Sequence, residues 1–227
     1  MILLIGGEKG GTGKTTLVTN LAALRGSAGR DVLVVDTDVQ GSASYWASIR
    51  DESNLQPRVS SIQKFGKGLI AEVRDLSNRY QDLIIDAGGR DSVELRSAMV
   101  AADQLVIPLQ ASQFDVWTLE RMAELVTQAR GLNDNLIARV VINRASSNPM
   151  VAETREAQLY LSEFPDLSLL RTVVRDRVAY RRAAGEGCGV AEMPNREKKA
   201  VAEMQLLYEE IYGEHWVQKT SNETNGR

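Results

Sequence analysis

The chain has 227 residues, of which 43% are hydrophobic, and a formal net charge of −3. This length suits one well-buried α/β domain and is short for two, and no apolar run approaches the roughly 18 residues that cross a membrane. The slightly acidic balance excludes a surface coated in positive charge, so any contact with nucleic acid has to come from a local basic patch.

Short apolar runs rich in β-branched residues alternate with longer amphipathic segments, which is the pattern of βαβ units. Several runs, such as 32–35, 83–85 and 140–142, are apolar throughout, as expected for strands covered on both faces. We therefore predict an α/β fold, a doubly wound, mostly parallel sheet flanked by helices on both faces. The predicted strands are 2–6, 31–36, 59–62, 82–86, 104–108, 137–142 and 169–174. The predicted helices are 14–27, 41–50, 67–79, 92–101, 115–131, 149–163, 177–184 and 196–212.

A glycine-rich stretch, residues 6–16, follows the first predicted strand and leads into the first predicted helix. Glycines let a backbone approach a polyphosphate and aim N–H groups at it, and the helix N-terminus adds partial positive charge. In such a loop Lys14 contacts the β- and γ-phosphates and the Thr15 hydroxyl ligates Mg²⁺. The stretch predicts a P-loop nucleotide site, and the alternative is a glycine turn with solvated lysines. The predicted nucleotide-binding residues of the loop are Gly10, Gly11, Thr12, Gly13, Lys14, Thr15 and Thr16.

The loop departs from the common G-x-x-x-x-G-K-[ST] pattern, since Glu8 stands where that pattern has glycine and Lys9 adds a second lysine. The resulting sequence, K-G-G-x-G-K-T-T, resembles the deviant loop of the ParA/MinD family of ATPases, which position cargo inside bacteria. The resemblance implies that Lys9 reaches across a nucleotide-sandwich homodimer to the partner's ATP phosphates. Lys9 and Lys14 are accordingly predicted to be catalytic.

Asp36 and Asp38 stand two residues apart at the end of the second predicted strand, where parallel strands deliver side chains to the ligand edge of a sheet. The segment resembles the D-x-D-P-Q element of the same family, with Val39 in the position of the proline. The resemblance implies that Asp36 holds the hydration shell of magnesium and that Asp38 is the catalytic residue that orients the attacking water. The alternative is a solvated pair of carboxylates that caps the helix near Gly41.

An apolar strand closed by Asp86 and followed by Gly88 and Gly89 resembles a Walker B element. Such a strand is weak evidence by itself, but here it follows the phosphate loop and the aspartate pair in the family's order. Its carboxylate is predicted to contact magnesium in the outer shell, and the glycines allow the next loop to respond to the γ-phosphate. The predicted metal set is Thr15, Asp36 and Asp86.

Two later segments also resemble elements of the family. Residues 108–115 resemble a loop of the dimer face, although Asp115 as an ordinary helix N-cap explains the segment nearly as well. Asn143 follows the sixth predicted strand, where relatives commonly place a side chain beside the adenine. Asn143 is therefore predicted to contact the base.

Residues 171–182 hold five arginines and one aspartate, and Arg196, Lys198 and Lys199 follow. Together they are predicted to form a strip with salt-sensitive, sequence-independent affinity for DNA. The alternative is a solvated helix face with one or two arginines lining the nucleotide pocket. The predicted DNA-binding residues are Arg175, Arg177, Arg181, Arg182, Arg196 and Lys199.

The last predicted helix, 196–212, is rich in acidic residues, so its apolar stripe should dock on the sheet rather than on anionic lipid. We predict an ATPase domain over residues 1–213, a polar tail over 214–227 and no membrane partner. The single Cys188 and the single His215 have no neighbours of catalytic or metal-ligating type. Thiol and histidine chemistry are therefore excluded.

The combined features favour a ParA-type ATPase that uses ATP and Mg²⁺. The resemblance implies that ATP closes a homodimer, that the dimer binds DNA nonspecifically, and that a ParB-like or other cargo-adaptor protein stimulates hydrolysis during plasmid or chromosome partition or cargo positioning. A chain that starts almost at its first strand is expected to lack a helix-turn-helix domain for operator binding. It is expected to be cytoplasmic, and nucleoid-associated when ATP is bound.

Other function classes remain as alternatives. A MinD-like membrane-associated ATPase would bind liposomes with ATP. A dethiobiotin-synthetase-like ligase should lack Lys9, and a bacterial tyrosine kinase usually has a C-terminal tyrosine cluster, whereas Tyr208 and Tyr212 lie at the spacing of core residues on a helix.

Overall fold

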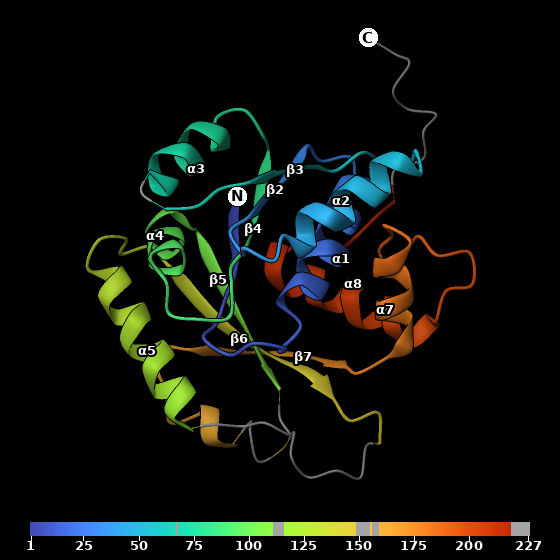
Figure 1. The fold of residues 1–227 in the computed structure, drawn as a ribbon. Coiled ribbons are helices and arrows are strands. Elements are labelled where there is room, and N and C mark those ends of the chain that lie inside the picture. The colour runs from blue at the N-terminus through green and yellow to red at the C-terminus, as the bar shows by residue number, and fades with distance from the viewer. Residues whose placement is uncertain (67, 111–115, 149–154, 156–158, 219–227) are drawn as a thin grey trace.

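The structure is a computed structural model that describes residues 1–66, 68–110, 116–148, 155 and 159–218. Within these ranges a 7-stranded sheet has the order β3-β2-β4-β1-β5-β6-β7, and every neighbouring pair is parallel (Figure 1). The predicted α/β fold with a parallel sheet is confirmed. The strands are β1 (Ile2–Ile5), β2 (Val32–Asp36), β3 (Ser60–Gln63), β4 (Asp82–Asp86), β5 (Gln104–Gln110), β6 (Ile137–Ala145) and β7 (Ser168–Arg175).

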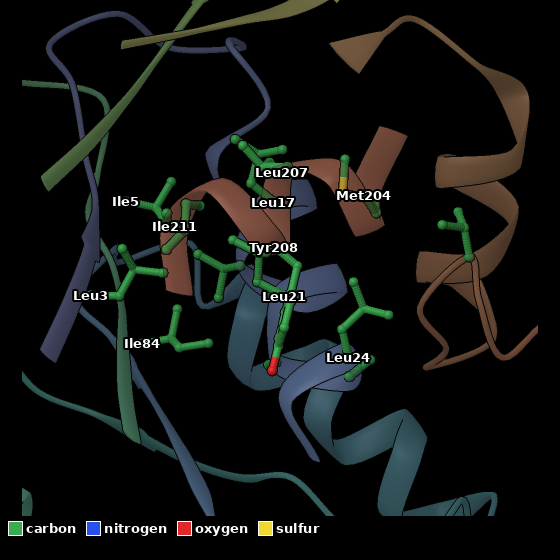
Figure 2. Packing of buried hydrophobic residues seen from close by; sticks show 14 of the residues in the cluster. Leu3, Ile5, Leu17, Leu21, Leu24, Ile84, Met204, Leu207, Tyr208 and Ile211 are labelled. Atoms are coloured by element: carbon green, nitrogen blue, oxygen red, sulfur yellow. The ribbon is translucent and has the colours of Figure 1, made fainter. Parts of the chain in front are cut away.

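Helices cover both faces of the sheet, because successive residues of a buried strand point to opposite sides. In β1, Leu4 belongs to the core under α3, α4 and α5, whereas Leu3 and Ile5 belong to the core under α1, α2, α7 and α8 (Figures 1 and 2). The helices are α1 (Lys14–Ser27), α2 (Ser42–Glu52), α3 (Leu69–Ser77), α4 (Val93–Ala101), α5 (Val116–Arg130), α7 (Val178–Gly185) and α8 (Lys198–Tyr212).

The last helix packs as the sequence predicts. Figure 2 shows Met204, Leu207, Tyr208 and Ile211 of α8 directed toward the residues of α1 and β1, and each of these four side chains is at most 3% exposed. The apolar face of α8 is therefore covered by the protein itself. Among the described residues, no helix is both long and apolar enough to cross a membrane.

The observed elements follow the predicted order, with differences at their ends. β5 and β6 run further than predicted because their pairing continues to the register Gln110 with Asn143. The predicted helix 149–163 lies largely outside the described residues. Of its described residues, 155 and 159–161 are helical. The predicted dimer-face loop, 108–115, is described only as far as Gln110, so Ser112 and Asp115 lie outside as well.

Packing continues past the predicted boundary at residue 213. The indole Nε1 of Trp216 donates to the Leu24 carbonyl at 3.0 Å and lies 3.2 Å from the Ser27 hydroxyl, both on α1. Glu214 pairs with the guanidinium of Arg25 and accepts from the Tyr208 hydroxyl at 2.9 Å. These contacts place Glu214 and Trp216 in the folded domain, because they tie the chain end to the C-terminal turn of α1.

Candidate nucleotide-binding site

The carboxyl ends of β1, β2 and β4 meet at one edge of the sheet. Ile5 is in register with Asp86, and Asp86 is in register with Asp36 on its other side. Connections leave β1 and β4 toward opposite halves and opposite faces of the sheet, which is the topological switch point where doubly wound sheets bind ligands. The glycine-rich stretch thus opens at the position that the fold favours for a ligand.

The phosphate loop has the backbone conformation that its glycines permit. Gly11 and Gly13 have φ values of 76° and 88°, in the region that side-chain-bearing residues avoid. Gly13 immediately precedes α1 and provides no side-chain cap. The N–H groups of the first turn of α1 are therefore directed at the loop, as an anion site requires.

Lys14 lies inside this loop with 7% of its surface exposed. Its Nζ donates to the Lys9 carbonyl oxygen at 2.8 Å. Burial lowers the pKa of the Lys14 ammonium, and the carboxylates of Asp86 and Asp38 oppose that shift. The ammonium is thus held across the loop, near Asp86, which is predicted to bind the metal, and Asp38, which is predicted to be catalytic.

Thr15 and Asp86 form the part of the site that suits a metal ion. The Thr15 hydroxyl donates to Asp86 Oδ2 at 2.7 Å, whereas the buried Asp86 Oδ1 has no hydrogen-bond partner in the described residues. Desolvation by burial raises the pKa of Asp86 to about 7, and the neighbouring Asp36 acts in the same direction. Hydroxyl and carboxylate oxygens are the ligands that Mg²⁺ prefers, so an unpartnered oxygen at this position fits the ion.

Asp36 and Asp38 are brought together as predicted, and Asp36 also organises the turn. Asp36 Oδ1 accepts from the Asp38 N–H at 3.1 Å and its Oδ2 accepts from the Ser44 N–H at 2.9 Å, which fixes the start of α2. Asp38 Oδ1 accepts from the Gln40 N–H at 3.0 Å. The metal role of Asp36 and the catalytic role of Asp38 stay predictions.

The glycine pair after β4 touches both the phosphate loop and Asp38. A methyl carbon placed on Gly88 would lie 3.6 Å from the Asp38 carboxyl carbon. The same addition to Gly89 would lie 2.9 Å from Gly10 Cα and 3.3 Å from Lys14 Nζ. The distance at Gly88 is an ordinary contact, whereas the approach at Gly89 requires glycine, so the backbone at Gly89 lies against the phosphate loop.

Asn143 has a contact that the sequence did not predict. Its Nδ2 donates to the Thr12 carbonyl at 2.6 Å, and a methyl carbon on Gly13 would come within 2.5 Å of the same nitrogen. Arg144, with φ of 51°, donates to the Gly11 carbonyl at 2.6 Å. These two residues support the phosphate loop from β6. The contact of Asn143 with the base stays a prediction.

A pocket of about 190 Å³ opens beside these residues. It adjoins the first turn of α1 at Gly13 and Thr16. The sequence did not predict that Arg144, Asp176 and Tyr180 line this pocket. Their positions near the end of β6, directly after β7 and in the first turn of α7 were the available signals. The lining residues are Gly13, Thr16, Asn143, Arg144, Arg175, Asp176, Arg177, Tyr180 and Arg181.

A comparison of the sequence with models of known protein families identifies the family of this chain. Residues 3–190 match the CobQ/CobB/MinD/ParA nucleotide-binding domain, a range that contains the phosphate loop, both aspartates after β2 and Asp86. The chain belongs to the CobQ/CobB/MinD/ParA family. The resemblance that rests on the deviant loop is therefore confirmed.

Relatives within the CobQ/CobB/MinD/ParA family match nearly the whole chain. The maintenance of carboxysome distribution protein A of Halothiobacillus neapolitanus is 28% identical over 210 residues, which are 92% of this chain and 95% of the relative. An ATP complex of a Cyanothece McdA variant has a TM-score of 0.77 at 20% identity and covers 96% and 98% of the two chains. The Mg-ADP complex of the septum site-determining protein MinD from Pyrococcus horikoshii has a TM-score of 0.69 at 20% identity, with coverages of 92% and 95%. The two structures share the fold of this family member.

The predicted DNA strip of this family member divides into half-buried residues with partners and exposed residues. The Arg177 side chain is 11% exposed and pairs with Glu203 at 2.6 Å and with Glu197 at 2.7 Å, and these pairs raise its pKa further. The Arg175 guanidinium donates to the Ser146 carbonyl at 2.5 Å. The Arg177 guanidinium joins the start of α7 to α8, and both arginines line the pocket beside the phosphate loop. Their contact with DNA stays a prediction. The exposed members of the strip are Arg181, Arg182, Arg196 and Lys199.

Proposed function

We propose that this chain is a ParA-type ATPase, which hydrolyses ATP to ADP and phosphate with Mg²⁺. The observation that carries the proposal is the buried Oδ1 of Asp86, which has no hydrogen-bond partner among the described residues and lies beside Thr15 at the start of the phosphate-loop helix. The test is phosphate release by the purified chain with ATP and Mg²⁺. No turnover above background, with Mg²⁺ and with a range of DNA and partner proteins present, would contradict the proposal.

The residues divide the work of phosphoryl transfer. Lys14 exchanges the Lys9 carbonyl for the β- and γ-phosphates, which the N–H groups of the loop and of α1 also bind. Thr15, Asp36 and Asp86 would hold Mg²⁺, which would neutralise charge on the phosphates. Asp38 orients the attacking water, a role that needs alignment more than a strong base.

Lys9 is proposed to act across a homodimer that closes on two ATP molecules. Lys9 lies beside Gly10 on the phosphate loop, beyond the carboxyl end of β1. Lys9→Ala should leave ADP binding within about twofold and should reduce both ATP-dependent dimerisation and turnover by about tenfold or more, since a charge-assisted contact to phosphate is lost. Size-exclusion chromatography with ATP and a phosphate-release assay measure the two effects. A variant that dimerises and hydrolyses ATP like the wild type would remove Lys9 from the mechanism.

The cellular task proposed for the dimer is partition or positioning of cargo. The relative from Halothiobacillus neapolitanus is named for carboxysome distribution, and a further relative, 26% identical over 69% of this chain, is the chromosome-partitioning ATPase Soj of Thermus thermophilus. By analogy, the ATP-bound dimer binds nonspecific DNA on the nucleoid, and a ParB-like or other cargo-adaptor protein stimulates hydrolysis and release. The buried apolar face of α8 argues against a MinD-like membrane anchor at this helix.

The exposed basic residues Arg182 and Arg196, neither of which lines the pocket beside the phosphate loop, give this proposal a direct test. Replacing both with glutamate should weaken binding to random-sequence DNA by about tenfold or more and lower the salt slope by about two, because two phosphate contacts are lost. ATP turnover without DNA should not change. Arg58→Glu with Arg79→Glu, two exposed arginines paired with Asp51 and Asp75, is the matched control. Unchanged affinity and salt slope would place the DNA surface elsewhere.

A further inference from the structure

Glu8 is the residue of the phosphate loop that the nucleotide chemistry leaves unexplained. It replaces the glycine of the common pattern, yet its side chain does not point freely into solvent: Glu8 Oε1 lies 3.7 Å from Nε of Arg121 on α5, and the side chain is 22% exposed. Burial raises the pKa of the Glu8 carboxyl, and Arg121 opposes that shift. The carboxylate of this residue of the phosphate loop therefore has a cation beside it.

The same guanidinium holds a second carboxylate. Nη2 of Arg121 lies 3.0 Å from Oδ2 of Asp91, and Asp91 also receives Arg96 Nε at 2.7 Å and Nη2 at 2.6 Å. Arg121 further contacts Glu124 on its own helix at 2.9 Å. Arg121 thus lies between one carboxylate from the loop after β1 and one from the segment after β4.

Asp91 stands two residues beyond Gly89, which lies against the phosphate loop. The segment 88–91 therefore meets the phosphate loop at two places, through the backbone at Gly10 and through Arg121 at Glu8. These two contacts connect segment 88–91 to the phosphate loop.

We propose that Arg121 is a positioning residue that links Glu8 of the phosphate loop to Asp91 of the segment after β4 and so sets the preference for ATP over ADP. The inference rests on the proposed function and assigns a role to Glu8 within it. Single exposed ion pairs contribute little to stability, but removing Arg121 takes away the guanidinium that faces Glu8, whereas Asp91 keeps its two contacts with Arg96. A Glu8 carboxylate left without this cation on the phosphate loop repels a triphosphate more than a diphosphate, because the triphosphate carries more negative charge.

The test compares nucleotide affinities of Arg121→Gln by titration calorimetry with ADP and with ATPγS, each with Mg²⁺. We expect the affinity for ATPγS to fall by about fivefold and that for ADP to stay within about twofold. Arg130→Gln is the matched control, since Arg130 lies on the same helix and pairs with Asp166 at 2.8 Å, outside the network. The control should bind both nucleotides like the wild type.

Rescue separates this role from a merely structural one. Adding Glu8→Gln to Arg121→Gln removes the unpaired carboxylate and should restore part of the ATPγS affinity, whereas general loss of packing would not be repaired. Equal losses for ADP and ATPγS, an unchanged Arg121→Gln variant, or no rescue would each overturn the inference while leaving the proposed function in place. A wild-type chain that binds neither nucleotide would overturn both.

Discussion

Replacing Lys14 with alanine should weaken binding of Mg-ATP by at least about 100-fold, to the point where turnover is lost. The Lys14 side chain is 7% exposed and its ammonium already donates to a loop carbonyl, so it is positioned within the cradle before phosphate arrives. Removing a desolvated charged donor from phosphate oxygens costs about 3 kcal/mol, which is the stated factor in affinity. Titration with a fluorescent ATP analogue measures the change.

The matched control is Lys198→Ala, which removes an exposed lysine at the start of α8. It should bind ATP like the wild type. Thermal unfolding without nucleotide checks that Lys14→Ala is folded, and we expect little change because the removed ammonium is desolvated and its pKa is lowered by burial. Wild-type ATP affinity in a folded Lys14→Ala protein would refute the role assigned to this lysine.

Replacing Asp38 with alanine should have the opposite pattern, retained ATP binding with turnover reduced by about 100-fold or more. Binding is retained because the substitution removes a negative charge from the neighbourhood of the phosphates. Turnover is lost because no carboxylate remains beside Gly88 to orient the water. Nucleotide-dependent chromatography should then detect an ATP-trapped dimer, while a phosphate-release assay records the loss of hydrolysis.

The companion variant Asp38→Asn separates chemistry from local structure. Its side-chain oxygen can still accept from the Gln40 N–H, a bond of 3.0 Å in the structure, so the turn before α2 is kept. We expect Asp38→Asn to bind ATP and to turn it over as slowly as Asp38→Ala. Normal hydrolysis by either variant would remove Asp38 from the mechanism.

The core of the site could be predicted from sequence because its residues lie at strand ends. Asp36 and Asp86 close apolar strands, Thr15 lies in the first turn of α1 after the loop that follows β1, and the parallel sheet places the ends of these strands side by side. Asn143 also follows such a run, but its amide nitrogen bonds the Thr12 carbonyl. No local pattern indicates that bond, since the two residues come from distant parts of the chain.

The basic stretch shows a different limit. Its composition predicts a positive surface, but the charges that pair with Arg177 come from Glu197 and from Glu203 on α8. The exposure of a side chain depends on which segments pack against it, and composition carries no information about that packing. For the same reason, the sequence showed Glu8 only as a residue that replaces the glycine of the common phosphate-loop pattern. The structure shows that its carboxylate contacts Arg121 on α5.

The sequence by itself determined the order of strands and helices, the parallel sheet and the phosphate loop, because apolar periodicity and glycine spacing are local properties. The tertiary structure decided which polar groups are satisfied and which are not. Asp86 keeps an unpartnered buried oxygen, Arg177 is paired, and Arg121 joins Glu8 to Asp91. These outcomes depend on distances between segments remote in sequence, and such distances are fixed only when the chain packs.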